Sequence, residues 1–92
     1  MPSLLTNDMT DKCFLCGHYG VIHKHHIFGA SRRNTSEKYG LYVHLCVGCH
    51  TYIHGKYGKE MMQYLHELGQ KVYEEQIGSR EQFIKEFNRS YL

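Results

Sequence analysis

No apolar stretch in this 92-residue chain approaches the roughly 18 to 20 residues that cross a bilayer, so no membrane partner is expected. The first residues also lack the basic region and apolar core of a signal peptide, which predicts a cytoplasmic protein. Internal repeats and low-complexity linkers are absent as well, so residues 1–92 are expected to form a single domain. A chain this short buries a smaller share of its surface than a larger one, and a bound metal would help to stabilise it.

A strong net charge is also missing. The charge of +2 is too small to indicate a nucleic-acid partner by itself. Its distribution is uneven, because residues 1–58 contain six Lys or Arg and three Asp or Glu, whereas residues 59–92 contain five and six. All four cysteines and seven of the eight histidines lie in the first of these segments. The chemistry of the protein is therefore expected in the first two-thirds of the chain.

The cysteines form two pairs with C-x-x-C spacing, separated by 29 residues: Cys13 with Cys16, and Cys46 with Cys49. Thiolates are soft ligands that favour zinc, and four of them close a tetrahedral shell, so we predict one structural Zn²⁺. Disulfides are the weaker alternative in a reducing compartment. Two further alternatives are unliganded core cysteines and the replacement of one thiol by a histidine such as His18.

The residue pattern predicts an α+β fold. A strand is expected over residues 21–27, then a polar loop with at most a helical turn over 31–39, and a second strand over 41–45 that leads into the second cysteine pair. A short helix follows from Cys49 and stops near Gly55 and Gly58. Within the domain we expect a flexible arm over residues 1–10, a zinc-tied core over 13–58 and a helical extension over 59–92.

The extension has apolar residues at helical spacing, which are expected to be core rather than a partner surface: Met61, Met62, Leu65, Leu68, Val72, Tyr73 and Ile77. Gly69 costs this helix roughly 1 kcal/mol relative to Ala, so a bend or a split is expected there. Ser79 and Gln82 have the spacing of a capping box and predict the start of a last helix. His66 is expected to face solvent.

The histidines suggest a second site. His50 and His54 lie four residues apart, so on a helix they share one face and can hold one metal or one phosphate. His25 and His26 are adjacent, near the end of the first predicted strand. If both cysteine pairs bind one zinc, the strands that leave it are neighbours and the doublet faces the helix. Strict alternation sends adjacent residues to opposite faces, so both reach one site only if the strand ends or bulges there.

Residues 13–54 resemble the HNH endonucleases, the ββα-metal or His-Me finger nucleases, particularly small phage and prophage members with flanking C-x-x-C pairs. The resemblance is carried by the first cysteine pair, by the His25-His26-Ile27 run, and by Leu45-Cys46-x-x-Cys49-His50. It implies a small zinc-stabilised, treble-clef-like ββα-metal core with additional C-terminal helices. It also implies hydrolysis or nicking of DNA that leaves a 5′-phosphate and a 3′-hydroxyl.

Position by position, the resemblance implies that His25 and His50 bind the catalytic metal and that His26 is the general base. His54 then stands as a third ligand or a phosphate contact. Leu41 occupies the place of the Asn that gives the motif its middle letter, so Asn34 or a backbone group would have to hold His26. The expected metal shell lacks a carboxylate, which favours Mn²⁺, Ni²⁺ or Zn²⁺ on ligand softness, while Mg²⁺ with several waters stays open.

Cations near this site are expected to contact DNA phosphates, although a solvated loop explains them equally well: Lys24, Arg32, Arg33 and Lys38. His23 is expected on the strand surface or in packing rather than as a ligand, and His44 is expected to be exposed or packed against the sheet. The alternative functions are a noncatalytic zinc-ribbon module that binds nucleic acid or protein, and a structural zinc domain in a phage assembly. A homodimer, or phage and recombination proteins as partners, fits either interpretation.

Overall fold

The architecture is that of a small α+β domain, seen in a computed structural model that describes residues 3–5 and 8–92. Strands β1 (Ile22–His26) and β2 (Tyr42–Cys46) form a two-stranded antiparallel sheet. A 3-10 turn, η1 (Ala30–Arg32), and helix α1 (Arg33–Lys38) connect them, and helices α2 (Val47–Ile53), α3 (Lys59–Gln76) and α4 (Arg80–Phe87) follow. The predicted fold class is confirmed at this level, and both strands lie within one residue of their predicted starts and ends.

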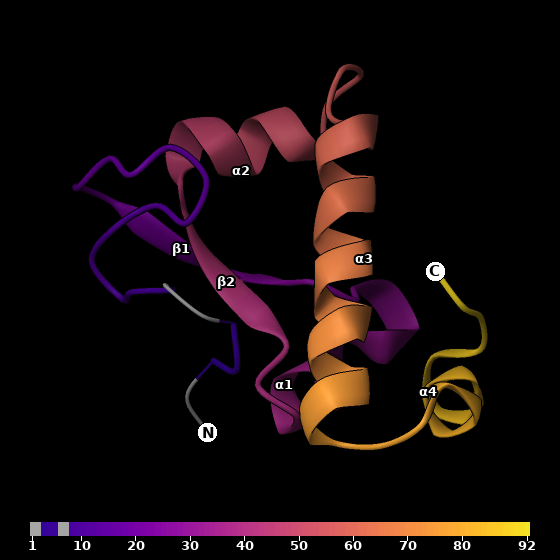
Figure 1. Cartoon of the computed structure of the whole chain (residues 1–92). Helices are drawn as coiled ribbons and strands as arrows, with labels where there is room; N and C mark the ends of the chain where they lie inside the picture. Colours follow the sequence, from indigo (N-terminus) through magenta and orange to yellow (C-terminus); the bar gives the residue numbers. More distant parts are fainter. Residues whose placement is uncertain (1–2, 6–7) are drawn as a thin grey trace.

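The sheet register sets which histidines face which helix. Residue pairs run from Ile22 opposite Cys46 to His26 opposite Tyr42. Because side chains alternate along a strand, His25 shares its face with the fully buried Val43 and Leu45 of β2. Figure 1 shows α2 leaving the end of β2 and the long helix α3 running beside the hairpin.

The core forms where the chain leaves β1 and meets the last two helices. Ile27 and Phe28 are almost fully buried there, as are Leu65, Tyr73 and Phe83. The Phe28 ring contacts the rings of Phe83 and Phe87 at centroid distances of 5.3 and 4.6 Å. The segment that carries His25 and His26 is therefore anchored immediately after its last histidine.

Helix α3 is not split at Gly69, contrary to the expectation from the sequence. It is continuous from Lys59 to Gln76, and a Cβ atom at Gly69 would lie 2.9 Å from Ile27 Cγ2 and 3.1 Å from the Phe28 ring. The glycine thus permits the chain leaving β1 to pack directly on the helix backbone. The last helix begins as predicted, because Ser79 Oγ accepts a hydrogen bond from the backbone N–H of Gln82.

Three other predictions need correction. Residues 30–38 form η1 and α1 rather than a polar loop, and α2 begins two residues before Cys49, at Val47. His66 does not face solvent freely, since its half-buried ring stacks on Phe28 with a centroid distance of 5.5 Å.

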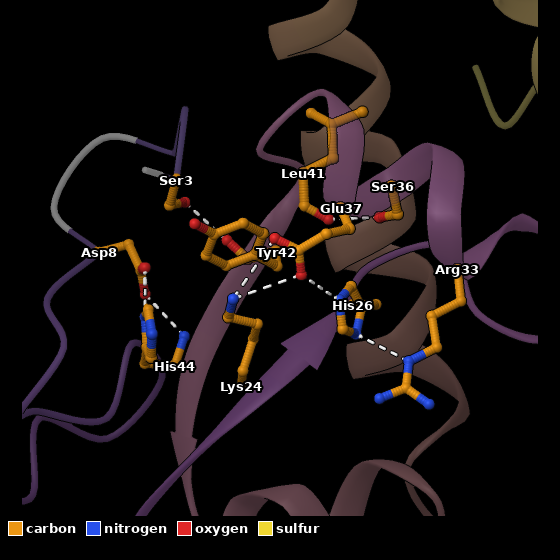
Figure 2. Close-up of polar contacts among 10 residues, drawn as sticks. All are labelled: Ser3, Asp8, Lys24, His26, Arg33, Ser36, Glu37, Leu41, Tyr42 and His44. Atoms are coloured by element: carbon orange, nitrogen blue, oxygen red, sulfur yellow. Dashed lines mark hydrogen bonds and ion pairs between the residues drawn. The ribbon is translucent and has the colours of Figure 1, made fainter. Parts of the chain in front are cut away.

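The N-terminal arm was predicted to span residues 1–10, of which residues 1–2 and 6–7 lie outside the described part of the chain. Its described residues contact the sheet and the core. Leu5 is buried in the core, and the Leu4 N–H donates to Gly40 O. Asp8 accepts hydrogen bonds from both the backbone N–H and the ring Nδ1 of His44, each at 2.7 Å (Figure 2). None of the helices in the described part of the chain combines the length and the apolar composition of a membrane span.

Candidate functional site

The four cysteines converge at one point, as the sequence predicted. The four Sγ atoms all lie within 4.8 Å of one another, and they belong to Cys13, Cys16, Cys46 and Cys49. Each pair is set by a tight turn in which the later cysteine directs its backbone N–H toward the earlier Sγ, at 3.5 Å for Cys16 and 3.4 Å for Cys49. Gly17, with φ of +76°, provides the left-handed residue that closes the first turn. His18 is not in the cluster.

The spacing of the sulfur atoms fits a zinc ion. A tetrahedral ion with Zn–S bonds of about 2.3 Å places neighbouring sulfurs about 3.8 Å apart. The Sγ atoms of Cys16 and Cys46, which belong to different pairs, are 3.7 Å apart. Four thiolates leave no open coordination position, so the cluster could hold a structural zinc that ties residues 13–16 to the start of α2.

The pKa values of the Cys13 and Cys49 thiols are shifted in opposite directions. Burial raises the pKa of Cys13, but N–H groups of Cys16, Cys46 and Leu15 donate toward its sulfur and bring the pKa down to about 6. Burial and the neighbouring thiols raise the pKa of Cys49. A thiolate at Cys13 would therefore be the first ligand available to a metal at neutral pH.

Three histidines form a second cluster. His25 comes from β1, and His50 and His54 lie one turn apart at α2; one ring nitrogen from each lies within 4.8 Å of the other two. The ring centroids are 5.5 Å apart for His25 and His50, and 5.4 Å apart for His25 and His54. The predicted convergence of a strand histidine with a helical pair is thus present in the structure.

His25 is the most informative member of this cluster. It is only 4% exposed, and among the described residues its Nε2 is the one buried side-chain nitrogen or oxygen without a hydrogen-bond partner. Burial, reinforced by the charges of His50 and His54, lowers its pKa to about 4, so the ring is neutral at physiological pH. A neutral imidazole nitrogen that is buried and unpaired, next to two further imidazoles, fits a divalent metal such as Zn²⁺, Ni²⁺ or Mn²⁺.

His23 is exposed on the strand and packs against His50 without belonging to the three-histidine cluster, as the sequence predicted. Its Nδ1 lies 3.4 Å from Nδ1 of His50. The contact is a hydrogen bond when one of the two nitrogens carries a proton and the other accepts it. Burial, followed by the charges of His54 and His23, lowers the pKa of His50. His23 therefore contacts His50 at its Nδ1.

His26 lies on the opposite face of the sheet from His25, as strand alternation requires. Its Nε2 is 2.7 Å from Oε1 of Glu37, and its Nδ1 accepts a hydrogen bond from Nε of Arg33 at 3.3 Å (Figure 2). Strand β1 ends at this residue, so both histidines reach the end of the sheet. A pocket of about 260 Å³ is lined by both of them together with Lys24, Arg33, His50 and His54.

The predicted catalytic role of Asn34 finds no support. Its side chain is exposed on α1, and in the described part of the chain the hydrogen bonds of the His26 ring go to Glu37 and Arg33. Leu41, at the place of the motif Asn, is fully buried in the core. Glu37 was missed, although a signal exists, since it is the only acidic residue between Asp11 and Glu60.

The predicted phosphate-binding cations separate into two groups. Lys24 and Arg33 line the pocket with the histidines, and Lys24 also pairs with Glu37 at 3.3 Å. Arg32 and Lys38 are not among its lining residues, and Lys38 lies over the ring of Tyr39 instead. Lys24 and Arg33 are thus the cations best placed to meet an anion in front of His26.

No family model, curated protein or solved structure matches this chain. The chemistry of the protein is therefore inferred from the two clusters and the pocket beside the histidines.

Proposed function

We propose that the protein is a metal-dependent DNA endonuclease of the HNH type, built on a ββα-metal core in which a zinc held by four cysteines is structural. The observation that carries the proposal is the buried, unpaired Nε2 of His25 in a cluster of three imidazoles, beside His26 in a basic pocket. A buried imidazole nitrogen without a partner lowers the stability of the fold, and a purely structural zinc domain would gain nothing from it.

The order of the elements supports this proposal. The histidine doublet ends β1, the chain returns in β2, and α2 then presents His50 and His54 to the doublet. The HNH resemblance has a metal ligand, a general base and a second metal ligand in this order. The thiol cluster lies at the junction of β2 and α2, where a structural zinc would fix the direction in which the helix leaves the sheet.

Each group in the pocket then has a chemical task. His25, His50 and His54 would hold the divalent metal, which supplies positive charge to the scissile phosphate and the leaving oxygen when bound. His26 Nδ1, which accepts from Arg33 in the structure, would become free to take a proton from an attacking water once Arg33 turns to a phosphate oxygen. Lys24 and Arg33 would bind phosphate oxygens of the DNA and so set the position of the DNA strand in the pocket. The products would carry a 5′-phosphate and a 3′-hydroxyl.

The test is nicking of supercoiled plasmid by zinc-loaded protein with Mg²⁺, Mn²⁺ or Ni²⁺, alongside a chelator control. We expect cleavage by the wild type, no cleavage by His26→Ala, and unchanged cleavage by His18→Ala, a matched exposed histidine outside both clusters. His26→Ala should still bind the added metal, whereas His25→Ala should not. Equal cleavage by wild type and His26→Ala, or none with any metal, would refute the proposal; DNA retention without cleavage would favour a noncatalytic binding module.

A further inference from the structure

We propose that Glu37 is the positioning residue of His26 and holds its ring as the tautomer whose Nδ1 lone pair serves as the base. This inference rests on the proposed function, because it concerns the same histidine. It replaces the role that the sequence assigned to Asn34 with a carboxylate from another position of helix α1.

The contacts of His26 determine where its proton lies. An ionised carboxylate can only accept hydrogen bonds, so the 2.7 Å contact with Glu37 requires a proton on Nε2. A guanidinium can only donate, so the 3.3 Å contact from Arg33 Nε requires a lone pair on Nδ1. Both contacts, which involve different ring nitrogens, therefore require the same neutral tautomer.

The charge state of Glu37 agrees with this assignment. The hydrogen bond from His26, together with the nearby Lys24, holds the pKa of the Glu37 carboxyl below its usual value. Lys24 Nζ lies 3.3 and 3.4 Å from the two carboxylate oxygens, and it also lies 4.3 Å from the centre of the Tyr42 ring. The carboxylate is thus held between a strand lysine and the histidine, as Figure 2 shows.

The position of Glu37 is fixed by the residue before it. Ser36 is fully buried; its hydroxyl donates to the Leu41 carbonyl and accepts from the backbone N–H of Phe28 at 3.2 Å. The Leu41 N–H donates in turn to Ser36 O at 2.9 Å. These bonds join α1 to the chain that leaves β1, two residues after His26, and to the chain that enters β2. The backbone that carries Glu37 is therefore fixed relative to the His26 ring.

In this arrangement Glu37 holds Nε2, while Nδ1 contacts Arg33, a residue that lines the same pocket and would move to a bound phosphate. In metal-bound histidines, partners of this kind fix the tautomer and ring orientation, and their loss costs about 10- to 100-fold in affinity or activity. We expect a loss of similar size for a base histidine, because a ring free to exchange tautomers presents the wrong nitrogen for part of the time.

The experiment has two readouts on the full chain with its zinc. The first is the ¹⁵N chemical shift of the His26 ring nitrogens, assigned by comparison with His26→Ala, without added catalytic metal. We expect a protonated Nε2 and an unprotonated Nδ1 in the wild type, and averaged shifts in Glu37→Ala. Glu37→Gln keeps an oxygen that can accept from Nε2, so it should retain most of the wild-type pattern.

The second readout is plasmid nicking, with a rate about 10- to 100-fold lower expected for Glu37→Ala and partial recovery for Glu37→Gln. Lys24→Ala, which removes the ion pair and leaves the His26 contact, should keep the wild-type tautomer. Glu60→Ala, an exposed acid on α3, should match the wild type in both readouts. A protonated Nδ1 in the wild type, or an unchanged tautomer in Glu37→Ala, would overturn the inference. If no form cleaves DNA, the nuclease proposal fails, while the tautomer measurement still decides the role of Glu37.

Discussion

Replacing His25 by Leu should make the protein more stable without added divalent metal and less stable with it, if the three-histidine cluster binds the metal as proposed. In the wild type, the unpaired Nε2 is buried in a residue that is only 4% exposed. Leaving a buried polar group unsatisfied costs about 1–3 kcal/mol, and the substitution removes this cost. The different shape of the leucine side chain reduces the gain by up to about 1.5 kcal/mol. The expected net gain is about 1 kcal/mol, which raises the Tm of a domain of this size by roughly 4–8 °C.

Added metal should reverse this order. A ligand at about 100 times its Kd stabilises the folded state by about 2.7 kcal/mol, and only the wild type would retain the three imidazoles. The assay is thermal unfolding of protein loaded with one equivalent of zinc, with and without Mn²⁺ or Ni²⁺. His18→Leu, at an exposed position outside both clusters, is the matched control and should follow the wild type. The reasoning is refuted if His25→Leu is less stable without metal, or if the variant gains as much from the metal as the wild type does.

Three further predictions concern the packing and the zinc cluster. Cys49→Ser should reduce the bound zinc, measured by release to a colorimetric chelator, because it removes one of four ligands; full zinc content would argue against a four-thiolate site. Gly69→Ala should lower the free energy of unfolding in urea by about 1 kcal/mol, since the new Cβ would lie 2.9 Å from Ile27 and outweigh the better helix propensity; a gain in stability would contradict this. Asp8→Ala should cost about 1–3 kcal/mol in the same assay, because two donors of His44 lose their acceptor, and an unchanged midpoint would contradict that role.

The features that the sequence predicted well are those encoded by spacing along the chain. Two C-x-x-C pairs each bring two thiols together through a local turn, and a four-residue interval places His50 and His54 on one face of a helix. The Ser79 cap is equally local, because its hydroxyl meets a backbone N–H three residues away. Alternation along a strand likewise predicts the opposite directions of His25 and His26, since it depends only on their being adjacent.

The features that escaped prediction depend on contacts between distant segments. Residues 33–38 have no apolar period, and the buried anchor of this helix is a serine whose hydrogen bonds go to Phe28 and Leu41. The local sequence predicts that Gly69 weakens the helix, whereas in the structure its missing side chain leaves room for Ile27 to pack on the helix. Asp8 reads as part of a polar arm, but it is the acceptor of His44 on β2. In each case the partner lies at least five residues away and follows no periodic rule.

The strand geometry explains why the proposed site needs two helices rather than one. Adjacent residues of β1 face opposite sides of the sheet, so no single helix could contact both His25 and His26. At helix α2, His50 and His54 place two further imidazoles next to His25. On helix α1, Glu37 places a carboxylate next to His26. The end of β1 at His26 lets the two rings line one pocket even though they are held from opposite faces. A metal ligand and a base can then be adjacent in sequence while each is oriented by its own set of partners.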